Sequence, residues 1–212
     1  MKRGFFITFE GTDGSGKTTI LNKLITQLEK HNLNVFRTRE PGGQNKVCED
    51  IRGVLLNNKD VDKYAESLLF AASRVQHVNK YIIPQISEGI SVISDRYLDS
   101  SIAYQGYGKN IDVKWIQEIN SFATNEFKPD FTFFFDIKPN IAQKRIMINP
   151  NREKNRFDLE SLEIQELVYK GYKEIIKNNP KKFILINAEL SVDEVYKQVW
   201  DKIKEIFGII ND

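Results

Sequence analysis

Residues 11–18 constrain this chain more than any other part of its sequence. Their letters, GTDGSGKT, match the phosphate-binding pattern G-x-x-x-x-G-K-[ST] in full. Glycines let the backbone turn tightly and bring its N–H groups close to phosphate oxygens. Residues 4–10 before the loop are aromatic and β-branched, and residues 18–30 after it have apolar side chains at helical spacing. Because the motif requires a strand before it and a helix after it, the sequence predicts ATP or GTP binding.

Strand-like and helix-like stretches alternate along the rest of the chain. Strands are predicted at residues 4–10, 34–38, 91–95, 131–137 and 183–187, and a long helical region at about 63–88. The strands are continuous apolar runs, as expected for a sheet that is buried on both faces. This pattern predicts an α/β fold with a five-stranded parallel sheet flanked by helices. We interpret the polar residues 149–158 as a connector or a short lid within a single domain, residues 1–212.

Composition limits the class of protein and its partners. At 212 residues the chain can bury about 70% of its unfolded surface without disulfides. Its net charge of +2 gives no overall attraction to nucleic acid. The single cysteine, Cys48, excludes an intramolecular disulfide or a cysteine zinc site. The N-terminal apolar stretch is short for a signal peptide and no run suits a membrane span, so we expect a cytoplasmic protein that binds neither nucleic acid nor membrane.

Each part of the phosphate-binding loop has an expected task. The helix that follows directs its partly positive N-terminus at the phosphates. Lys17 is predicted to reach the β- and γ-phosphates, and the Thr18 hydroxyl to ligate Mg²⁺. The residues predicted to bind ATP are Gly11, Thr12, Asp13, Gly14, Ser15, Gly16, Lys17, Thr18 and Thr19.

Four segments of the chain resemble bacterial thymidylate kinases. They are residues 9–14 (FEGTDG), 38–43 (TREPGG), 69–74 (LFAASR) and 95–106 (DRYLDSSIAYQG). Their order and spacing match that family, and the similarity extends over nearly the whole chain. No guanine-reading N-K-x-D string occurs in the sequence. The resemblance implies a P-loop nucleotide kinase fold that transfers the terminal phosphoryl group of Mg-ATP to dTMP, in dTTP synthesis.

The resemblance assigns roles to charged residues near the predicted strand ends. Asp95 ends a predicted strand, where a carboxylate would meet Mg²⁺ directly or through water. Arg96, helped by Arg52, would bind the 5′-phosphate of the acceptor, because the guanidinium fork matches phosphate oxygens. Without the motif, an Asp-Arg pair at a strand end is more often a structural salt bridge.

A second group of residues is implied to recognise the acceptor base and sugar. Phe70 and Arg74 lie four residues apart on one helix face, so both can reach one planar ligand. The resemblance implies that Phe70 stacks on thymine and Arg74 bonds a base carbonyl, although a core role for Phe70 is the alternative. Tyr104 is similar to the residue that packs under the sugar and disfavours a 2′-hydroxyl. The other implied acceptor residues are Glu40 and Pro41, Ser100 and Ser101, and Gln105, with Asp13 also near the sugar.

The lid segment contains two arginines, Arg152 and Arg156. Thymidylate kinases carry an additional arginine either in the P-loop or in the lid, and the corresponding loop position here is Gly14. The resemblance therefore implies that the lid arginines stabilise charge on the transferring phosphoryl group. The alternative is a solvated charged loop. The predicted catalytic residues are Lys17, Arg96, Arg152, Arg156 and Asp13.

Rival functions stay open at this point. One is another deoxynucleotide or deoxynucleoside kinase of the same fold; Arg96 and Arg52 favour an acceptor that is already phosphorylated. Another is a P-loop ATPase that acts on a protein partner and turns over ATP without a nucleotide acceptor.

The resemblance also implies a homodimer through helices that flank the acceptor site. His31 and His77 show no metal or triad spacing, so we interpret both as surface or capping residues.

Overall fold

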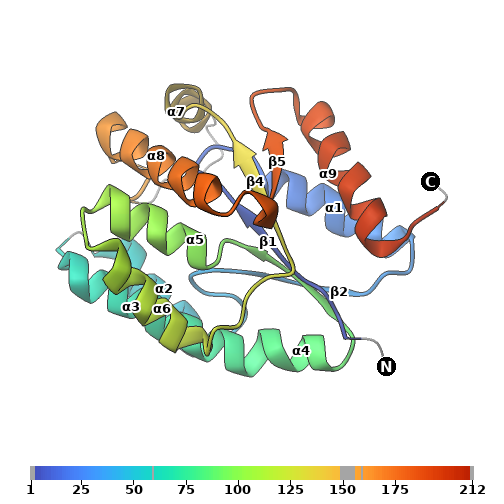
Figure 1. Cartoon of the computed structure of the whole chain (residues 1–212), viewed down its shortest axis with the longest axis horizontal. Coiled ribbons are helices and arrows are strands. Elements are labelled where there is room, and N and C mark those ends of the chain that lie inside the picture. The colour runs from blue at the N-terminus through green and yellow to red at the C-terminus, as the bar shows by residue number, and fades with distance from the viewer. Residues whose placement is uncertain (1–2, 59, 149–155, 159, 211–212) are drawn as a thin grey trace.

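The protein is built around a five-stranded parallel sheet with strand order β2-β3-β1-β4-β5 (Figure 1). The structure, a computed structural model, describes residues 3–58, 60–148, 156–158 and 160–210. The strands are β1 (Phe6–Glu10), β2 (Val35–Arg39), β3 (Ser91–Asp95), β4 (Phe131–Asp136) and β5 (Phe183–Asn187). Every predicted strand is present with similar bounds, which confirms the predicted α/β fold and parallel sheet.

Helices cover both faces of this sheet (Figure 1). They are α1 (Lys17–Lys30), α2 (Lys46–Asn57), α3 (Lys63–His77), α4 (Ile83–Ser87), α5 (Leu98–Ser101), α6 (Val113–Thr124), α7 (Pro139–Ile148), α8 (Leu162–Asn178) and α9 (Val192–Phe207). Wider π-helical segments are η1 (Val78–Ile82) and η2 (Ile102–Gly108), and η3 (Pro180–Lys182) is a 3₁₀ turn. Helices α1 and α9 pack together on one face, and α3 to α6 with α8 lie on the other. No helix in the described ranges has the length and apolar character needed to cross a membrane.

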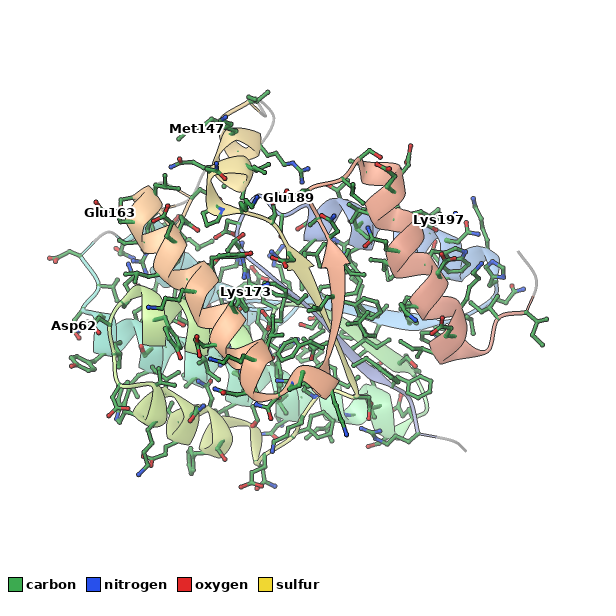
Figure 2. All side chains as sticks on the ribbon, turned by 45° about the horizontal axis from the view of Figure 1, so that its top comes forward. Asp62, Met147, Glu163, Lys173, Glu189 and Lys197 are labelled. Atoms are coloured by element: carbon green, nitrogen blue, oxygen red, sulfur yellow. The ribbon has the colours of Figure 1, made fainter. Side chains whose placement is uncertain are left out.

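Alternate residues of the central strands belong to different hydrophobic cores. Ile7 and Phe9 of β1 pack with α1 and α9 in the larger core. Phe6, which precedes Ile7 in β1, joins Tyr97 on the opposite face, and Phe134 of β4 joins Tyr172 of α8. Charged side chains such as those of α8 and α9 point outward instead (Figure 2). Because both faces are covered, the strands need apolar residues at successive positions, which explains their continuous apolar runs.

The predicted helical region at about 63–88 is present but is not uniform. It begins at Asp62, whose carboxylate caps the first turn by accepting from Tyr64 N at 2.9 Å. After α3, the backbone widens into η1, where Ile83 N donates to Val78 O. Pro84 follows directly and has no N–H to donate, so the regular hydrogen-bond ladder is interrupted here. The helix then continues as α4 to Ser87.

The carboxyl ends of three adjacent strands bring separate loops together. In the register of β1 and β3, Phe9 lies opposite Asp95, and Arg96 N donates to Phe9 O at 2.9 Å. Glu40 N, just beyond β2, donates to Asp95 O at 3.0 Å. The loops after β1, β2 and β3 therefore meet at one edge, which is where ligands bind in open α/β sheets.

The contact between α8 and η2 provides a test of packing. A Cβ at Gly171 would lie 2.8 Å from atoms of the Tyr107 ring. We expect Gly171→Ala to lower the free energy of unfolding by about 1–3 kcal/mol, because overpacking outweighs the gain from alanine in a helix. Gly53→Ala in α2 is the control; its nearest neighbour would lie 4.0 Å away, so it should stabilise by about 0.5–1 kcal/mol. Urea denaturation that shifts both variants in the same direction would contradict this assignment.

Candidate active site

The phosphate-binding loop lies between β1 and α1, as its pattern requires. Gly14 and Gly16 have φ values of 79° and 87°, and a Cβ on Gly14 would lie 2.4 Å from Ala142 O. Glycine is therefore needed at position 14 for space as well as for conformation. Lys17 folds back into the loop, where Nζ donates to Gly11 O at 3.0 Å and Thr12 O at 2.9 Å. Its ammonium is thus held beside the backbone that would surround the phosphates.

Lys17 has an unusual environment for a lysine. Burial lowers its pKa to about 8, and the nearby Arg96 guanidinium acts in the same direction, while Asp95 and Asp13 oppose the shift. A lysine with this pKa loses its charge only slightly above neutral pH. Phosphate oxygens would restore the charged form by supplying negative charge at short distance.

Thr18, in the first turn of α1, lies next to Asp95 at the end of β3. Thr18 Oγ1 donates to Asp95 Oδ2 at 2.8 Å, so a hydroxyl oxygen and a carboxylate oxygen lie side by side. Mg²⁺ prefers oxygen ligands of this kind and keeps several of its waters. The donor set therefore fits the predicted magnesium site, and Thr18 and Asp95 stay its predicted ligands.

Arg96 connects the end of β3 to the phosphate-binding loop. Its backbone has φ of 77°, and its guanidinium donates to Gly11 O at 2.9 Å, Asp13 Oδ1 at 2.9 Å and Tyr104 Oη at 3.1 Å. Burial raises the pKa of the Tyr104 phenol well above its ordinary value. The hydroxyl therefore stays protonated and donates a hydrogen bond to Asp13 Oδ2. A left-handed conformation in an arginine is a strained state that the surrounding contacts must maintain.

A buried carboxylate lies beneath Arg96 and was not predicted as a site residue. Glu10 Oε1 accepts from Tyr97 N at 2.8 Å, and Oε2 accepts from Ser100 Oγ at 2.6 Å and Tyr172 Oη at 2.9 Å. Burial raises the pKa of Glu10, and the neighbouring Asp99 adds to this shift. Tyr172 Oη also accepts from Arg96 at 3.3 Å. The carboxylate at the end of the apolar run of β1 was the available signal for Glu10, whereas Tyr172 is one of two tyrosines in an amphipathic helix.

Every residue predicted to bind the acceptor lines one cavity. Phe70 and Arg74 come from α3, Tyr104 and Gln105 from η2, and Pro41 from the loop after β2. The core alternative for Phe70 is not supported, because its side chain is only partly buried and contributes to the cavity wall. Phe157 also lines this cavity, and its ring centroid lies 6.1 Å from that of Phe70. It follows Arg156 directly and was not predicted to belong to the site.

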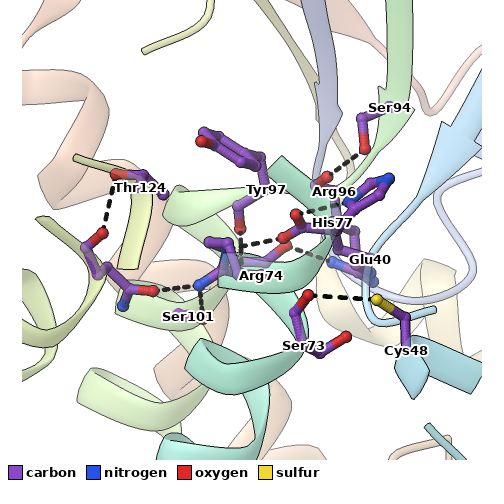
Figure 3. Close-up of polar contacts among 12 residues, drawn as sticks. Glu40, Cys48, Ser73, Arg74, His77, Ser94, Arg96, Tyr97, Ser101 and Thr124 are labelled. Carbon is purple, nitrogen blue, oxygen red and sulfur yellow. Dashed lines mark hydrogen bonds and ion pairs between the residues drawn. The ribbon is translucent and has the colours of Figure 1, made fainter. Parts of the chain in front are cut away.

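Arg74 and His77 converge on the carboxylate of Glu40 (Figure 3). Arg74 Nε donates to Glu40 Oε2 at 2.7 Å, and His77 Nδ1 lies 2.9 Å from Glu40 Oε1. Although burial opposes it, the Arg74 and His77 partners lower the pKa of Glu40. The interpretation of His77 as a surface or capping residue is wrong, since His77 is 0% exposed and its Nε2 contacts Thr38 Oγ1 at 2.6 Å. His31, in contrast, does occupy the C-cap of α1.

A second, more polar cavity surrounds the phosphate-binding loop. It is lined by Lys17, Thr18 and Asp95, and it shares Asp13, Glu40, Arg52 and Arg96 with the acceptor cavity. Arg52 Nη1 donates to Pro41 O at 2.9 Å, which positions its guanidinium between the two cavities. The two cavities therefore have a common wall of two arginines and two carboxylates.

A third cavity lies on the other side of the loop. Residues 14–16 and Thr19 form one wall, and the start of α9 forms the opposite wall. Arg145 of α7 contributes to it and donates to Ala188 O at 2.7 Å and Glu189 O at 3.1 Å. Arg145 was not among the predicted site residues, and no motif in the sequence distinguishes it from Lys144, the other basic residue of α7.

The two lid arginines differ in what the structure describes. Arg152 lies outside the described residues. Arg156 is directed toward the acceptor side, where its Nη2 donates to Glu66 Oε2 at 2.6 Å and its Nε donates to Leu55 O. In this arrangement Arg156 contacts α2 and α3 and is not part of the wall of the phosphate cavity.

Comparison with known proteins agrees with this geometry. A family model described as thymidylate kinase matches residues 9–199. The chain belongs to the thymidylate kinase family. It is 46% identical over 206 residues to a thymidylate kinase of Mycoplasma capricolum, an alignment that covers 94% of this chain and 96% of the relative. A thymidylate kinase of Clostridium novyi is 45% identical over 201 residues, an alignment that covers 94% of this chain and 98% of the relative. One of Bacillus licheniformis is 45% identical over 204 residues, which covers 95% of this chain and 96% of the relative. These relatives match nearly the whole chain, so the resemblance to this family is confirmed.

The depressed pKa of Lys17 predicts a pH dependence for nucleotide binding. Only the charged ammonium attracts phosphate, so a ligand that raises this pKa must take up a proton when it binds above pH 8. We expect the affinity for Mg-ATP to be constant below that pH and to fall by up to about tenfold per pH unit above it. Calorimetry between about pH 6.5 and 9.5 measures this slope. Lys17→Arg should remove the slope because guanidinium stays charged, and a flat wild-type profile would contradict the assignment.

Proposed function

We propose that this protein phosphorylates dTMP to dTDP with Mg-ATP as phosphoryl donor, a reaction that serves dTTP synthesis. The observation that carries the proposal is the common wall of the acceptor and phosphate cavities. An acceptor whose base lies beside Phe70 would have its 5′-phosphate at Arg52 and Arg96. That phosphate would face the γ-phosphate held at Lys17, as in-line transfer requires.

Positioning and charge stabilisation are sufficient for this chemistry. Lys17 and Arg96 would stabilise the negative charge that spreads over the phosphoryl oxygens, and no covalent intermediate with the protein is needed. The Asp13 and Glu40 carboxylates each have an arginine partner, at 2.9 Å and 2.7 Å. Such pairing makes a carboxylate a poor proton acceptor. This favours an acceptor that is already phosphorylated over a nucleoside, whose 5′-hydroxyl would need a base.

The donor side fits ATP. The cavity between the loop and the start of α9 would receive the adenine base, with Arg145 against it. Thr18 and Asp95 would hold Mg²⁺, which, when bound, would neutralise part of the charge on the phosphates. Tyr104, whose ring lies 4.9 Å from the Arg96 guanidinium, would pack under the acceptor sugar and leave little room for a 2′-hydroxyl.

The proposal extends to the organisation of the chain. Residues 1–212 would form a single domain, with residues 149–158 as a lid that contributes Arg152 and Arg156. Two copies would associate through α3 and α6, which pack together and expose apolar side chains: Tyr64 is 49%, Leu68 52% and Phe122 88% exposed. We also propose that the protein acts in the cytoplasm, on small nucleotides alone.

Substrate turnover tests the central proposal. With Mg-ATP, ADP release should be fast with dTMP, slower with dUMP and absent with water alone. Phe70→Ala should reduce kcat/KM for dTMP by roughly 10- to 100-fold, because stacking on a base contributes about 1–3 kcal/mol. Steady ADP release without any nucleotide acceptor would instead support the rival ATPase function.

Substitution of the lid arginines tests their role in catalysis. We expect Arg152→Ala to reduce kcat more than it raises the KM for dTMP, and Arg156→Ala, which also removes the partner of Glu66, to lower kcat and raise that KM together. The loss in the double variant should be at least on the order of a hundredfold, because these charges would act on the transition state. Lys144→Ala is the control, since it removes an exposed positive charge from nearby α7. An unchanged kcat in the double variant would exclude the lid from the mechanism.

A further inference from the structure

Glu66 is a buried carboxylate at the edge of the acceptor cavity for which the reaction described above has no role. It lies in the first turn of α3 and is 1% exposed. Its two oxygens accept from two different parts of the chain. Oε2 accepts from Arg156 Nη2 at 2.6 Å, and Oε1 accepts from Gln105 Nε2 at 3.1 Å. A single carboxylate therefore joins Arg156 to an amide in the cavity wall.

This arrangement determines which end of the Gln105 amide faces Glu66. Arginine can only donate hydrogen bonds, and a carboxylate paired with it can only accept them. Gln105 must then present its NH₂ group to Glu66. Its carbonyl oxygen is left for the cavity, and within the described part of the chain that oxygen accepts no hydrogen bond. The hydrogen bonds that join Arg156, Glu66 and Gln105 therefore have a fixed direction, because both outer residues donate to the Glu66 carboxylate.

The direction of this amide matters for the choice of base. Thymine and uracil carry an N3–H donor between two carbonyl groups, whereas N3 of cytosine is an acceptor beside an amino group. A carbonyl oxygen placed opposite N3 can accept from the first kind of base and repels the second. We propose that Glu66 is a positioning residue that selects a thymine-type acceptor base by holding the Gln105 carbonyl toward the cavity. This inference rests on the proposed function and adds to it the residue that sets its base preference.

The surroundings of Glu66 support a fixed geometry. Arg156 is held on a second side by the Leu55 carbonyl, and its guanidinium lies 4.2 Å from the centroid of the Phe157 ring. Phe157 in turn lies against Phe70 in the cavity wall. A buried carboxylate without such a partner would be strongly unfavourable, so Arg156 also makes the burial of Glu66 possible.

Glu66→Gln reverses the direction of the hydrogen bond to Gln105 without changing the size of the side chain. Arg156 would hold the carbonyl of the new amide, whose NH₂ would then face Gln105. Gln105 would turn its own carbonyl to that NH₂ and present its NH₂ to the cavity, where it suits cytosine. We expect the ratio of Kd for dCMP to Kd for dTMP, measured by calorimetry, to fall by roughly 10- to 100-fold. The corresponding ratio of kcat/KM values should fall in parallel.

A ratio separates this role from a structural one, because general damage to the site weakens both ligands alike. The matched control is Asp136→Asn, which alters a carboxylate that also accepts from two groups, Tyr169 at 2.9 Å and Lys173 at 3.0 Å, but lines none of the three cavities described above. It should retain the wild-type ratio. The exchange variant Glu66→Gln with Gln105→Glu keeps the charge and restores an acceptor oxygen to the cavity, so it should regain the preference for dTMP.

The outcomes separate this inference from the proposed function. A Glu66→Gln variant that keeps the wild-type ratio, or an exchange variant that does not regain it, would overturn the role of Glu66. A wild-type protein that binds dCMP as well as dTMP would overturn it too. Selective binding of dTMP without phosphoryl transfer would contradict the proposed function and leave the role of Glu66 supported.

Discussion

The site depends on the buried guanidinium of Arg96. This side chain crosses from the end of β3 to the loop after β1 and donates to the loop backbone at Gly11 and to the carboxylate of Asp13. Its backbone donates to Phe9, so main chain and side chain both tie β3 to β1. Because this one residue contacts the phosphate-binding loop and lines both cavities, the position of the loop constrains that of the cavity proposed for the acceptor. The left-handed backbone of Arg96 is consistent with a constraint that the surrounding fold must stabilise.

Two buried carboxylates provide the support for this arrangement. Glu10 lies under Arg96 and accepts from the backbone of Tyr97 and from two hydroxyls, while Glu40 accepts from Arg74 and His77. Burying a carboxylate costs several kcal/mol unless its oxygens are paired and hydrogen-bonded. These networks therefore add little net stability, but removing one partner would leave a charge without compensation. Their effect is to hold the cavity side chains in one geometry, which positioning by the protein requires.

Much of the fold was predictable from sequence because its signals are local. The strands are continuous apolar runs and the phosphate-binding loop is a contiguous motif, so neither depends on distant contacts. The helical region after Asp62 was also predictable, but its widening at η1 was not recognised, although Pro84 was a visible reason for it. The residues predicted to bind the acceptor come from segments with recognisable motifs, and the structure brings them into one cavity. The environment of His77 was misjudged because a lone histidine in a helix carries no pattern that identifies its partner.

The sequence by itself determined the order of strands and helices along the chain, the phosphate-binding loop and the family to which the chain belongs. These features depend on spacing within short segments, and spacing is visible in the letters. Only the tertiary structure decided which side chains share a hydrogen bond. Glu10 and Tyr172 are 162 positions apart in the chain, and Glu66 and Arg156 are 90 apart. Such pairs form where the parallel sheet aligns its strand ends and the helices fold back over them, and no periodicity in the sequence encodes that meeting point.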